Sequence, residues 1–281
     1  MDRKLDGIDH VIVGVRDLEA ARAGYARLGF AVTPRGRHVG WGTANSCVML
    51  EDGYLELLGI VDPAAFTNNL DRFLAEREGA TTLVLRSRDA EGTQAAWREA
   101  GLPAEAPKEL GRRLEAEEGP LELRFRNTLL PASATAGLGL FACQHLTPEM
   151  LRRPEWLDHP NGARRIRSCT VVVDDPAPLA EAMARVIGSA AVTDTDRVIA
   201  VHVGHGVVLI APPEDAMLMH PAAAIPDEVP KPQLRVVTLE VGDAGQAAAW
   251  LRQEGVPFVE TREGAFLPPE RAHGVALELV R

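Results

Sequence analysis

The segment HVIVGVRDLEAARAGYARLGF (residues 10–30) contains an apolar run, an acidic residue, an Ala-rich stretch and a glycine, in that order. The apolar run predicts a buried strand, because Val and Ile are favoured on a pleated surface. Asp17 stands where a helix N-cap accepts hydrogen bonds from unpaired backbone N–H groups. Gly29 stands where a left-handed residue ends a helix. The segment therefore predicts a strand followed by a helix of about three turns.

The same pattern occurs three more times in the chain. The further copies are LVLRSRDAEGTQAAWREAGL (83–102), CTVVVDDPAPLAEAMARVIG (169–188) and VVTLEVGDAGQAAAWLRQEGV (236–256). The acidic residue and the closing glycine are 12 or 13 residues apart in every copy. Each predicted helix also carries one large side chain at a similar position along its length. We expect these side chains to pack each helix onto its sheet: Tyr25, Trp97, Met183 and Trp250.

Further strand-like runs follow each helix, and the last run of each unit begins at a glycine. These last runs are residues 53–60, 137–145, 206–212 and 274–280. Each unit therefore reads strand–helix–strand–strand–strand, and four units account for nearly the whole chain. The sequence predicts an α+β fold of four βαβββ modules, forming two domains of two modules each. We place these domains at residues 1–147 and 166–281, with residues 148–165 as the linker between them.

Composition limits the classes of function. The 281 residues carry a formal net charge of −10 and a pI near 5.3, which argues against nucleic acid or an anionic membrane as the main partner. The three cysteines show no C-x-x-C spacing, and no P-loop, G-x-S-x-G or G-x-G-x-x-G motif follows a first strand. The polar N-terminus MDRKLDG does not look like a signal peptide, so we expect a cytoplasmic protein without a membrane span.

Two ionisable residues interrupt strand-like apolar runs. His10 lies near the start of IDHVIVGV (8–15), and Glu56 lies within YLELL (54–58). An unpaired charge is costly to bury, so the strand face carrying Glu56 either opens onto a pocket or meets a positive group. An imidazole and a carboxylate together suit Zn²⁺, Fe²⁺, Mn²⁺ or Ni²⁺.

The chain resembles the vicinal oxygen chelate superfamily, which includes glyoxalase I, methylmalonyl-CoA epimerase, extradiol dioxygenases and bleomycin-resistance proteins. The resemblance to the glyoxalase-like members lies in Asp9–Val11, Gly42–Asn45, Tyr54–Leu57 and the linker QHLTPE…WLDHPNGA. It implies that paired modules curl their sheets into a cup. It also implies a divalent metal (Zn, Mn, Ni or Fe) at the floor of the cup, bound by residues from the first and last strands.

The resemblance implies His10 and Glu56 as metal ligands, with Glu56 also as a catalytic proton shuttle. Counting back seven residues from each helix-capping Asp gives poor ligands in the other modules: Thr82, Ser168 and Val236. Leu209 replaces the last-strand Glu in the third module, so we expect the second half to lack a working site.

A further ligand can come from either of two modules. In the second module, strand alternation allows either Gln144 or His145 to face the cup, and we prefer His145 because imidazole is the better ligand. If the first module pairs with the fourth instead, Glu278 takes that place.

The substrate is expected to contact four residues: Tyr54, Asn45, His159 and Asn161. For His159 and Asn161, a turn that docks the linker against the cup is an alternative. The remaining histidines lack metal-ligand neighbours at a telling spacing and are predicted to lie in turns or at the surface: His38, His202, His205, His220 and His273.

Two functions remain open. The first is a divalent-metal-dependent lyase or isomerase acting on a small oxygenated substrate in the cup. A dioxygenase is less favoured, because the two-His, one-Glu ligand set of extradiol enzymes is not evident. The alternative is a metal-free protein that binds a small molecule or an antibiotic, as bleomycin-resistance proteins do. Either way the partner is a small molecule, and both a monomer and a homodimer are compatible with four modules.

Overall fold

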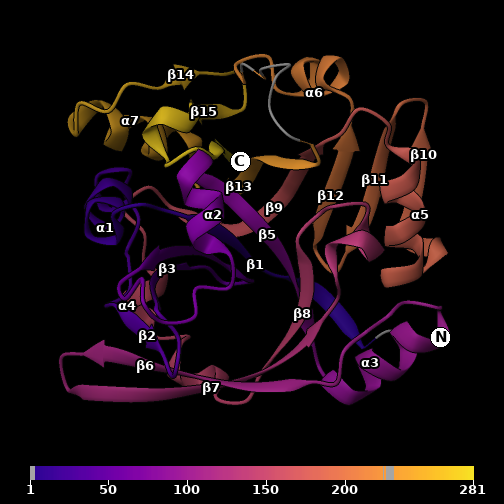
Figure 1. Cartoon of the computed structure of the whole chain (residues 1–281). Coiled ribbons are helices and arrows are strands. Elements are labelled where there is room, and N and C mark those ends of the chain that lie inside the picture. The colour runs from indigo at the N-terminus through magenta and orange to yellow at the C-terminus, as the bar shows by residue number, and fades with distance from the viewer. Residues whose placement is uncertain (1–3, 224, 226–230) are drawn as a thin grey trace.

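The computed structural model describes residues 4–223, 225 and 231–281, and its strands form two sheets (Figure 1). The first two modules build a closed barrel with the strand order β1-β4-β3-β2-β6-β7-β8-β5. The last two build an eight-stranded sheet with the order β10-β11-β12-β9-β13-β16-β15-β14. This confirms the predicted α+β fold of four βαβββ modules.

The elements of the barrel follow the predicted order. The first module contains β1 (Leu5–Gly14), α1 (Leu18–Arg27), β2 (Gly36–His38), β3 (Thr43–Met49) and β4 (Tyr54–Ile60). After the connecting helix α2 (Leu70–Glu76), the second contains β5 (Gly79–Ser87), α3 (Ala90–Glu99), β6 (Lys108–Ala116), β7 (Gly119–Leu129) and β8 (Leu140–His145).

The second sheet repeats this order. After α4 (Pro154–Leu157), the third module contains β9 (Ala163–Val172), α5 (Ala177–Val186), β10 (Val192–Thr195), β11 (Val198–Val203) and β12 (Gly206–Ala211). After α6 (Pro213–Met219), the fourth contains β13 (Gln233–Val241), α7 (Ala244–Gln253), β14 (Val259–Glu260), β15 (Gly264–Leu267) and β16 (Ala276–Val280). Strand β9 thus begins inside the segment predicted as a linker.

Acidic caps begin three of the four module helices. The side chains of Asp17, Asp89 and Asp243 accept hydrogen bonds from backbone N–H groups of α1, α3 and α7. Pro176 takes the N-cap position of α5, and the preceding Asp175 accepts a hydrogen bond from the N–H of Ala177 instead. The glycine after α1 has φ +89°, in the left-handed region, as predicted for Gly29.

Strand pairing decides which modules belong together. Within each module the first strand runs parallel to the last, as β1 does with β4 and β13 with β16. The first strands then join antiparallel across modules, β1 with β5 and β9 with β13. The first module is therefore paired with the second, and the third with the fourth.

Among the described residues, the buried apolar side chains form three clusters. Val11 and Val13 face a large core between the sheets and their helices, whereas Ile12 faces the barrel interior. A third cluster covers one face of the second sheet and includes Val236 and Phe266. Alternation along each strand therefore separates the structural core from the face on which a site can form.

Three of the four large helix residues are fully buried: Tyr25, Trp97 and Met183. Trp250 is only partly buried, and its indole N–H donates to the carbonyl of Arg27. A Cβ on Gly29 would lie 2.8 Å from the Trp250 ring, so this side chain packs against the end of α1. Trp250 thus joins α7 to the end of α1, as the indole N–H of Trp97 joins α3 to the carbonyl of Val186 in α5, and the expectation that these side chains pack each helix onto its own sheet stays a prediction.

Within the described part of the chain, every helix is too short or too polar to cross a bilayer.

Candidate functional site

His10 and Glu56 meet inside the barrel. In the parallel pairing of β1 with β4, His10 lies opposite Tyr54 and Ile12 lies opposite Glu56, so all four side chains can share the inner face. His10 Nε2 lies 3.2 Å from Glu56 Oε2, and both side chains are buried. The His10 ring also stacks on the Tyr54 ring with centroids 4.3 Å apart. The convergence of His10 and Glu56 that the sequence implied is therefore present.

Asp9 reaches the same imidazole from the other side. Adjacent residues of a regular strand face opposite ways, but the register of β1 on β5 shifts between Ile8 and His10. Such a bulge turns a side chain out of its ordinary direction. Asp9 Oδ2 lies 2.6 Å from His10 Nδ1. His10 is thus held between two buried carboxylates, one at each ring nitrogen.

This arrangement shifts the pKa values of all three groups. Burial alone would lower the pKa of His10, but its hydrogen bonds to Asp9 and Glu56 raise it above 6.5. Burial alone would raise the pKa of Glu56, but the contact with His10 lowers it to about 2. The pKa of Asp9 is also held well below its usual range, because His145 and His10 outweigh burial. Both carboxylates are ionised at neutral pH, and a proton on His10 is favoured.

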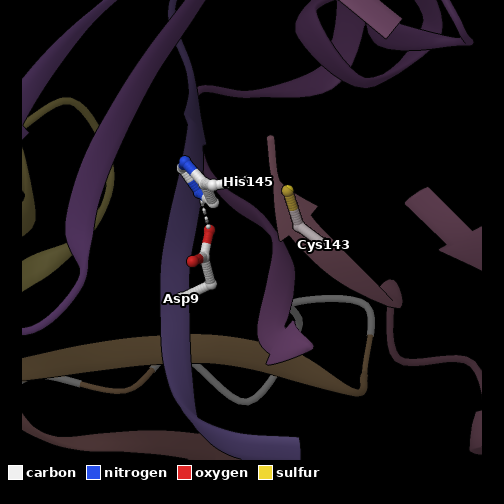
Figure 2. A group of neighbouring side chains, drawn as sticks. All are labelled: Asp9, Cys143 and His145. Carbon is white, nitrogen blue, oxygen red and sulfur yellow. Dashed lines mark hydrogen bonds and ion pairs between the residues drawn. The ribbon is translucent and has the colours of Figure 1, made fainter. Parts of the chain in front are cut away.

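His145 and Cys143 approach Asp9 from β8. His145 Nε2 lies 3.0 Å from Asp9 Oδ2, the contact drawn as a dashed line in Figure 2. Cys143 is two residues earlier on the same strand, and burial raises the pKa of its thiol well above 9. One donor atom from each of Asp9, Cys143 and His145 lies within 4.8 Å of the others, which makes these three a possible metal site.

Strand alternation separates His145 from Gln144 as expected. The Gln144 side chain accepts a hydrogen bond from the N–H of Ala90 and donates one to the carbonyl of Arg88, at the start of α3. His145 instead turns toward Asp9, with its ring 5.0 Å from that of Phe125.

Strand register, however, places Phe141 and not His145 at the position equivalent to Glu56. The antiparallel pairing of β1 with β5 makes Ile12 equivalent to Val84, and Val84 lies opposite Phe141. His145 lies four residues further along β8 and contacts Asp9. Its role as a ligand together with His10 and Glu56 stays a prediction.

Asn45 and His38 complete the surroundings of Glu56. Asn45 Nδ2 donates to Glu56 Oε1 over 2.5 Å. His38 Nε2 lies 3.8 Å from the same oxygen, and its Nδ1 is 2.9 Å from Thr43 Oγ1. The expectation that His38 is a surface or turn residue is wrong, because β2 closes the barrel and directs this ring inward. Burial lowers the pKa of His38.

Arg112, on β6, is a buried charge that the sequence analysis missed. It is 2% exposed and lies opposite His38 in the β2–β6 pairing. A signal for it was present: Leu110, Arg112 and Leu114 alternate along the strand, so Arg112 occupies an inward position. Asp9 is also an ionisable residue in an apolar run, next to His10. The direction of the Asp9 side chain, however, depends on the bulge in β1.

His159 and Asn161 fasten the linker to the first module. His159 Nδ1 accepts from the N–H of Ala31, and its Nε2 lies 2.6 Å from the carbonyl oxygen of Met49. Asn161 donates to the carbonyl of Leu28. Burial lowers the pKa of His159, in keeping with a neutral ring. These contacts are those of a docking turn, and a substrate-binding role for His159 and Asn161 stays a prediction, as it does for Tyr54 and Asn45.

Glu278 belongs to the second sheet and meets a different histidine. Its Oε1 lies 2.9 Å from His220 Nδ1, and its Oε2 accepts from the hydroxyl of Thr238. His220 Nε2 lies 2.8 Å from the hydroxyl oxygen of Thr170. The surface or turn position expected for His220 is wrong, because the chain after α6 directs its ring into the sheet, where it is 4% exposed.

A cavity of about 180 Å³ lies at one end of the barrel, beside the group formed by Asp9, Cys143 and His145. Asp9, Tyr54 and His145 contribute to its wall. Arginines also line it: Arg86, Arg88 and Arg152. A small molecule in this cavity would contact both Asp9 and His145.

Comparison with known proteins identifies the family. A family model described as a glyoxalase-like domain matches residues 8–187. None of the curated proteins matches the chain in sequence. A hypothetical protein from Staphylococcus aureus has a similar fold, with a TM-score of 0.68 and 11% identity over 97% of this chain and 98% of that one.

Two larger solved proteins share the fold at lower similarity. One is a mutant of 4-hydroxymandelate synthase from Streptomyces coelicolor, with a TM-score of 0.57 and 13% identity over 92% of this chain and 77% of that one. The other is a xylose isomerase-like TIM barrel/4-hydroxyphenylpyruvate dioxygenase fusion protein, with a TM-score of 0.57 and 15% identity over 91% and 40%. At these identities the similarity concerns the fold. With paired βαβββ modules and a family match over most of its length, the chain belongs to the glyoxalase-like domain family of the vicinal oxygen chelate superfamily.

Proposed function

We propose that this protein is a divalent-metal-dependent lyase or isomerase that acts on a small oxygenated substrate inside the barrel of the first two modules. The observation that carries the proposal is the 3.2 Å separation of His10 Nε2 and Glu56 Oε2. Ligand atoms about 2 Å from a common ion lie at about this distance from one another.

The donor set fits a metal. His10 supplies an imidazole nitrogen and Glu56 an ionised carboxylate, a combination that suits Zn²⁺, Mn²⁺, Ni²⁺ or Fe²⁺. Metal-binding histidines usually donate their second N–H to a carboxylate, which fixes the ring, and Asp9 is placed to accept that bond from Nδ1. Asn45 holds the other oxygen of Glu56. Thr82 and Phe141 supply no comparable ligand, so a metal held by His10 and Glu56 would keep coordination positions for a substrate with two neighbouring oxygens.

The residues of the barrel would divide the chemistry between them. A bound divalent metal would polarise the substrate oxygens and stabilise the negative charge that develops on them. Glu56 is a weak base while His10 holds its pKa near 2. Release of that contact would raise the pKa of Glu56 toward the ordinary value, and the carboxylate could then accept and return a substrate proton. Tyr54, stacked on His10, would shield the site from water.

A metal-free binding protein is the second candidate, and one observation favours it. Both nitrogens of His10 contact carboxylates, so the Asp9–His10–Glu56 cluster is satisfied without an ion when His10 is protonated. In that case the barrel would hold a small molecule without transforming it.

Metal titration separates the two candidates. The purified protein is stripped with a chelator and then titrated with Mn²⁺, Ni²⁺, Zn²⁺ and Fe²⁺, while the melting temperature and the bound metal are measured. An enzyme of the proposed kind binds one of these ions tightly, and its melting temperature rises. Absence of binding to all four ions refutes the metal-dependent function and leaves the binding protein.

A further inference from the structure

Arg112 is a buried cation, and within the described residues none of its nitrogens forms an ion pair with a carboxylate. Its Nη1 donates to Cys47 Sγ over 3.4 Å, and its guanidinium carbon lies 5.2 Å from the centre of the Phe125 ring. Across the part of the chain that the structure describes, neither Nε nor Nη2 of Arg112 has a hydrogen-bond partner. Buried charges are normally paired, so a guanidinium in this state indicates a ligand.

The two unsatisfied nitrogens have the geometry to bind a carboxylate. In a planar guanidinium, Nε–H and one Nη2–H point in parallel along the same edge and match the two oxygens of a carboxylate. Nη1 lies at the other side of the group and is occupied by the thiol of Cys47. Nε–H and Nη2–H of Arg112 can therefore donate two hydrogen bonds to one carboxylate.

The carboxylates of the barrel are engaged elsewhere. Asp9 contacts His10 and His145, and Glu56 contacts His10 and Asn45. Burial lowers the pKa of Arg112, but the neighbouring Cys47, Tyr54 and Glu56 outweigh it, so Arg112 remains charged. Glu56 acts on this charge from nearby, but its own oxygens are held by His10 and Asn45, so Nε and Nη2 of Arg112 are left for an anion from outside the chain.

The backbone places Arg112 close to the residues that surround Glu56. A Cβ on Gly36 would lie 2.9 Å from Arg112 Cδ and 2.8 Å from Asn45 Oδ1. The glycine of β2 thus leaves room for both side chains beneath it. Asn45 donates directly to Glu56, the proposed metal ligand. Asn45 is therefore the residue that connects Glu56 with the region of Arg112.

We infer that Arg112 binds the carboxylate of the substrate through Nε and Nη2, and that the substrate is a small 2-oxo or 2-hydroxy carboxylic acid. The inference rests on the proposed function, in which His10 and Glu56 act on the neighbouring oxygen. Arg112 is then the residue that selects acids over neutral analogues.

Ligand binding to matched variants tests this inference. The substitution Arg112→Met removes the guanidinium and keeps much of its volume. Arg113→Met is the control, because Arg113 is exposed on the same strand and pairs with Glu122. Binding of formate, pyruvate and methyl pyruvate is measured by calorimetry and by the melting temperature. We expect the wild type and Arg113→Met to bind formate and pyruvate and to bind methyl pyruvate much more weakly. Arg112→Met should lose at least about 30-fold in pyruvate affinity.

The stability of Arg112→Met excludes a trivial loss of fold. Removal of an unmatched buried charge should leave its ligand-free melting temperature equal to or above that of the wild type. Equal pyruvate binding by Arg112→Met and the wild type overturns the inference, as does absence of formate and pyruvate binding by the wild type.

A Mn²⁺ titration of the same proteins keeps this inference separate from the proposed function. If the wild type binds Mn²⁺ but no carboxylate, only the role of Arg112 is refuted. If pyruvate binds through Arg112 but no divalent ion binds, only the metal-dependent function is refuted.

Discussion

Glu56 and Glu278 occupy the same position in two modules, yet their surroundings differ. Glu56 on β4 lies opposite Ile12 of β1, and Glu278 on β16 lies opposite Thr238 of β13. Each carboxylate lies close to one histidine. His10 comes from the strand beside Glu56, whereas the equivalent position beside Glu278 is Val236, and His220 reaches Glu278 from the chain after α6.

The inner faces of the two sheets are also filled differently. Ala216 of α6 and Ala223 and Ile225 after it pack with Val236 and Phe266 over the second sheet. Figure 1 shows α6 beside β12 and away from the barrel. The barrel interior instead gathers ionisable side chains and borders a cavity. The same module therefore carries either a candidate site or ordinary core, depending on which part of the chain covers its face.

The largest expected effect tests whether the two glutamates really differ in function. Glu56→Gln removes a proposed metal ligand and should weaken divalent-metal binding more than about 100-fold, beyond the loss caused by outer partners. Glu278→Gln is the matched control and should leave metal affinity within about twofold. Calorimetry with Mn²⁺ and Zn²⁺ measures both. Equal losses in the two variants would remove the distinction between the sheets.

Asp9 provides the next test, because it is a carboxylate at the second ring nitrogen of His10, whereas the second ring nitrogen of His220 meets the hydroxyl of Thr170. Asp9→Asn removes the charge that orients His10 and should lower metal affinity by about 10- to 100-fold. The exposed Asp62 offers a control, Asp62→Asn, with no expected change. The same titration measures both variants. Unchanged affinity in Asp9→Asn would show that the bulge of β1 does not serve the site.

His220 tests the structural role assigned to the second sheet. His220→Ala leaves both Glu278 and Thr170 without their partner and opens space over the sheet, so we expect a loss of about 2–4 kcal/mol in the free energy of unfolding. Metal binding should be unchanged. Urea denaturation measures the loss, with the exposed His202→Ala as a control. A stable His220→Ala variant with weakened metal binding would place a site in the second sheet.

The smallest expected effect is a pH dependence that originates in the barrel. Without metal, Glu56 has a pKa lowered from 4.5 to about 2, so its contribution to stability is present above about 4.5 and lost as the pH falls toward 2. His10 has a raised pKa, so its contribution is present below 6.5 and lost as the pH rises through the folded value. Stability from this pair should therefore be greatest between about pH 4.5 and 6.5.

Urea unfolding of the metal-free protein from pH 3 to 8 measures this dependence. Glu56→Gln should remove roughly 2 kcal/mol of the acid-induced loss. If the wild type and Glu56→Gln lose stability in parallel below pH 4.5, the paired carboxylate does not contribute as described.

Much of the site was predictable from local sequence. His10 and Glu56 stood out as ionisable residues in apolar runs, and the family resemblance implied that they converge. Alternation also separated His145 from Gln144 correctly. The position of Arg112 between Leu110 and Leu114 also indicated an inward side chain, but Arg112 was not among the predicted site residues.

Other parts of the site depend on contacts that sequence spacing does not report. Asp9 faces His10 because of a bulge in β1, which arises from pairing with β5. His38 turns inward because β2 pairs with β6 of the other module. His220 reaches Glu278 from a connection of irregular structure.

The sequence by itself determined the four modules, because caps, apolar alternation and glycine stops act within about ten residues of one another. Tertiary structure decided which modules pair, which end of β8 lies beside Asp9, and which inner face is covered by α6. The physical reason is range: hydrogen bonding and burial within a strand or helix are local, whereas register and coverage are set by surfaces that meet only when the chain has folded.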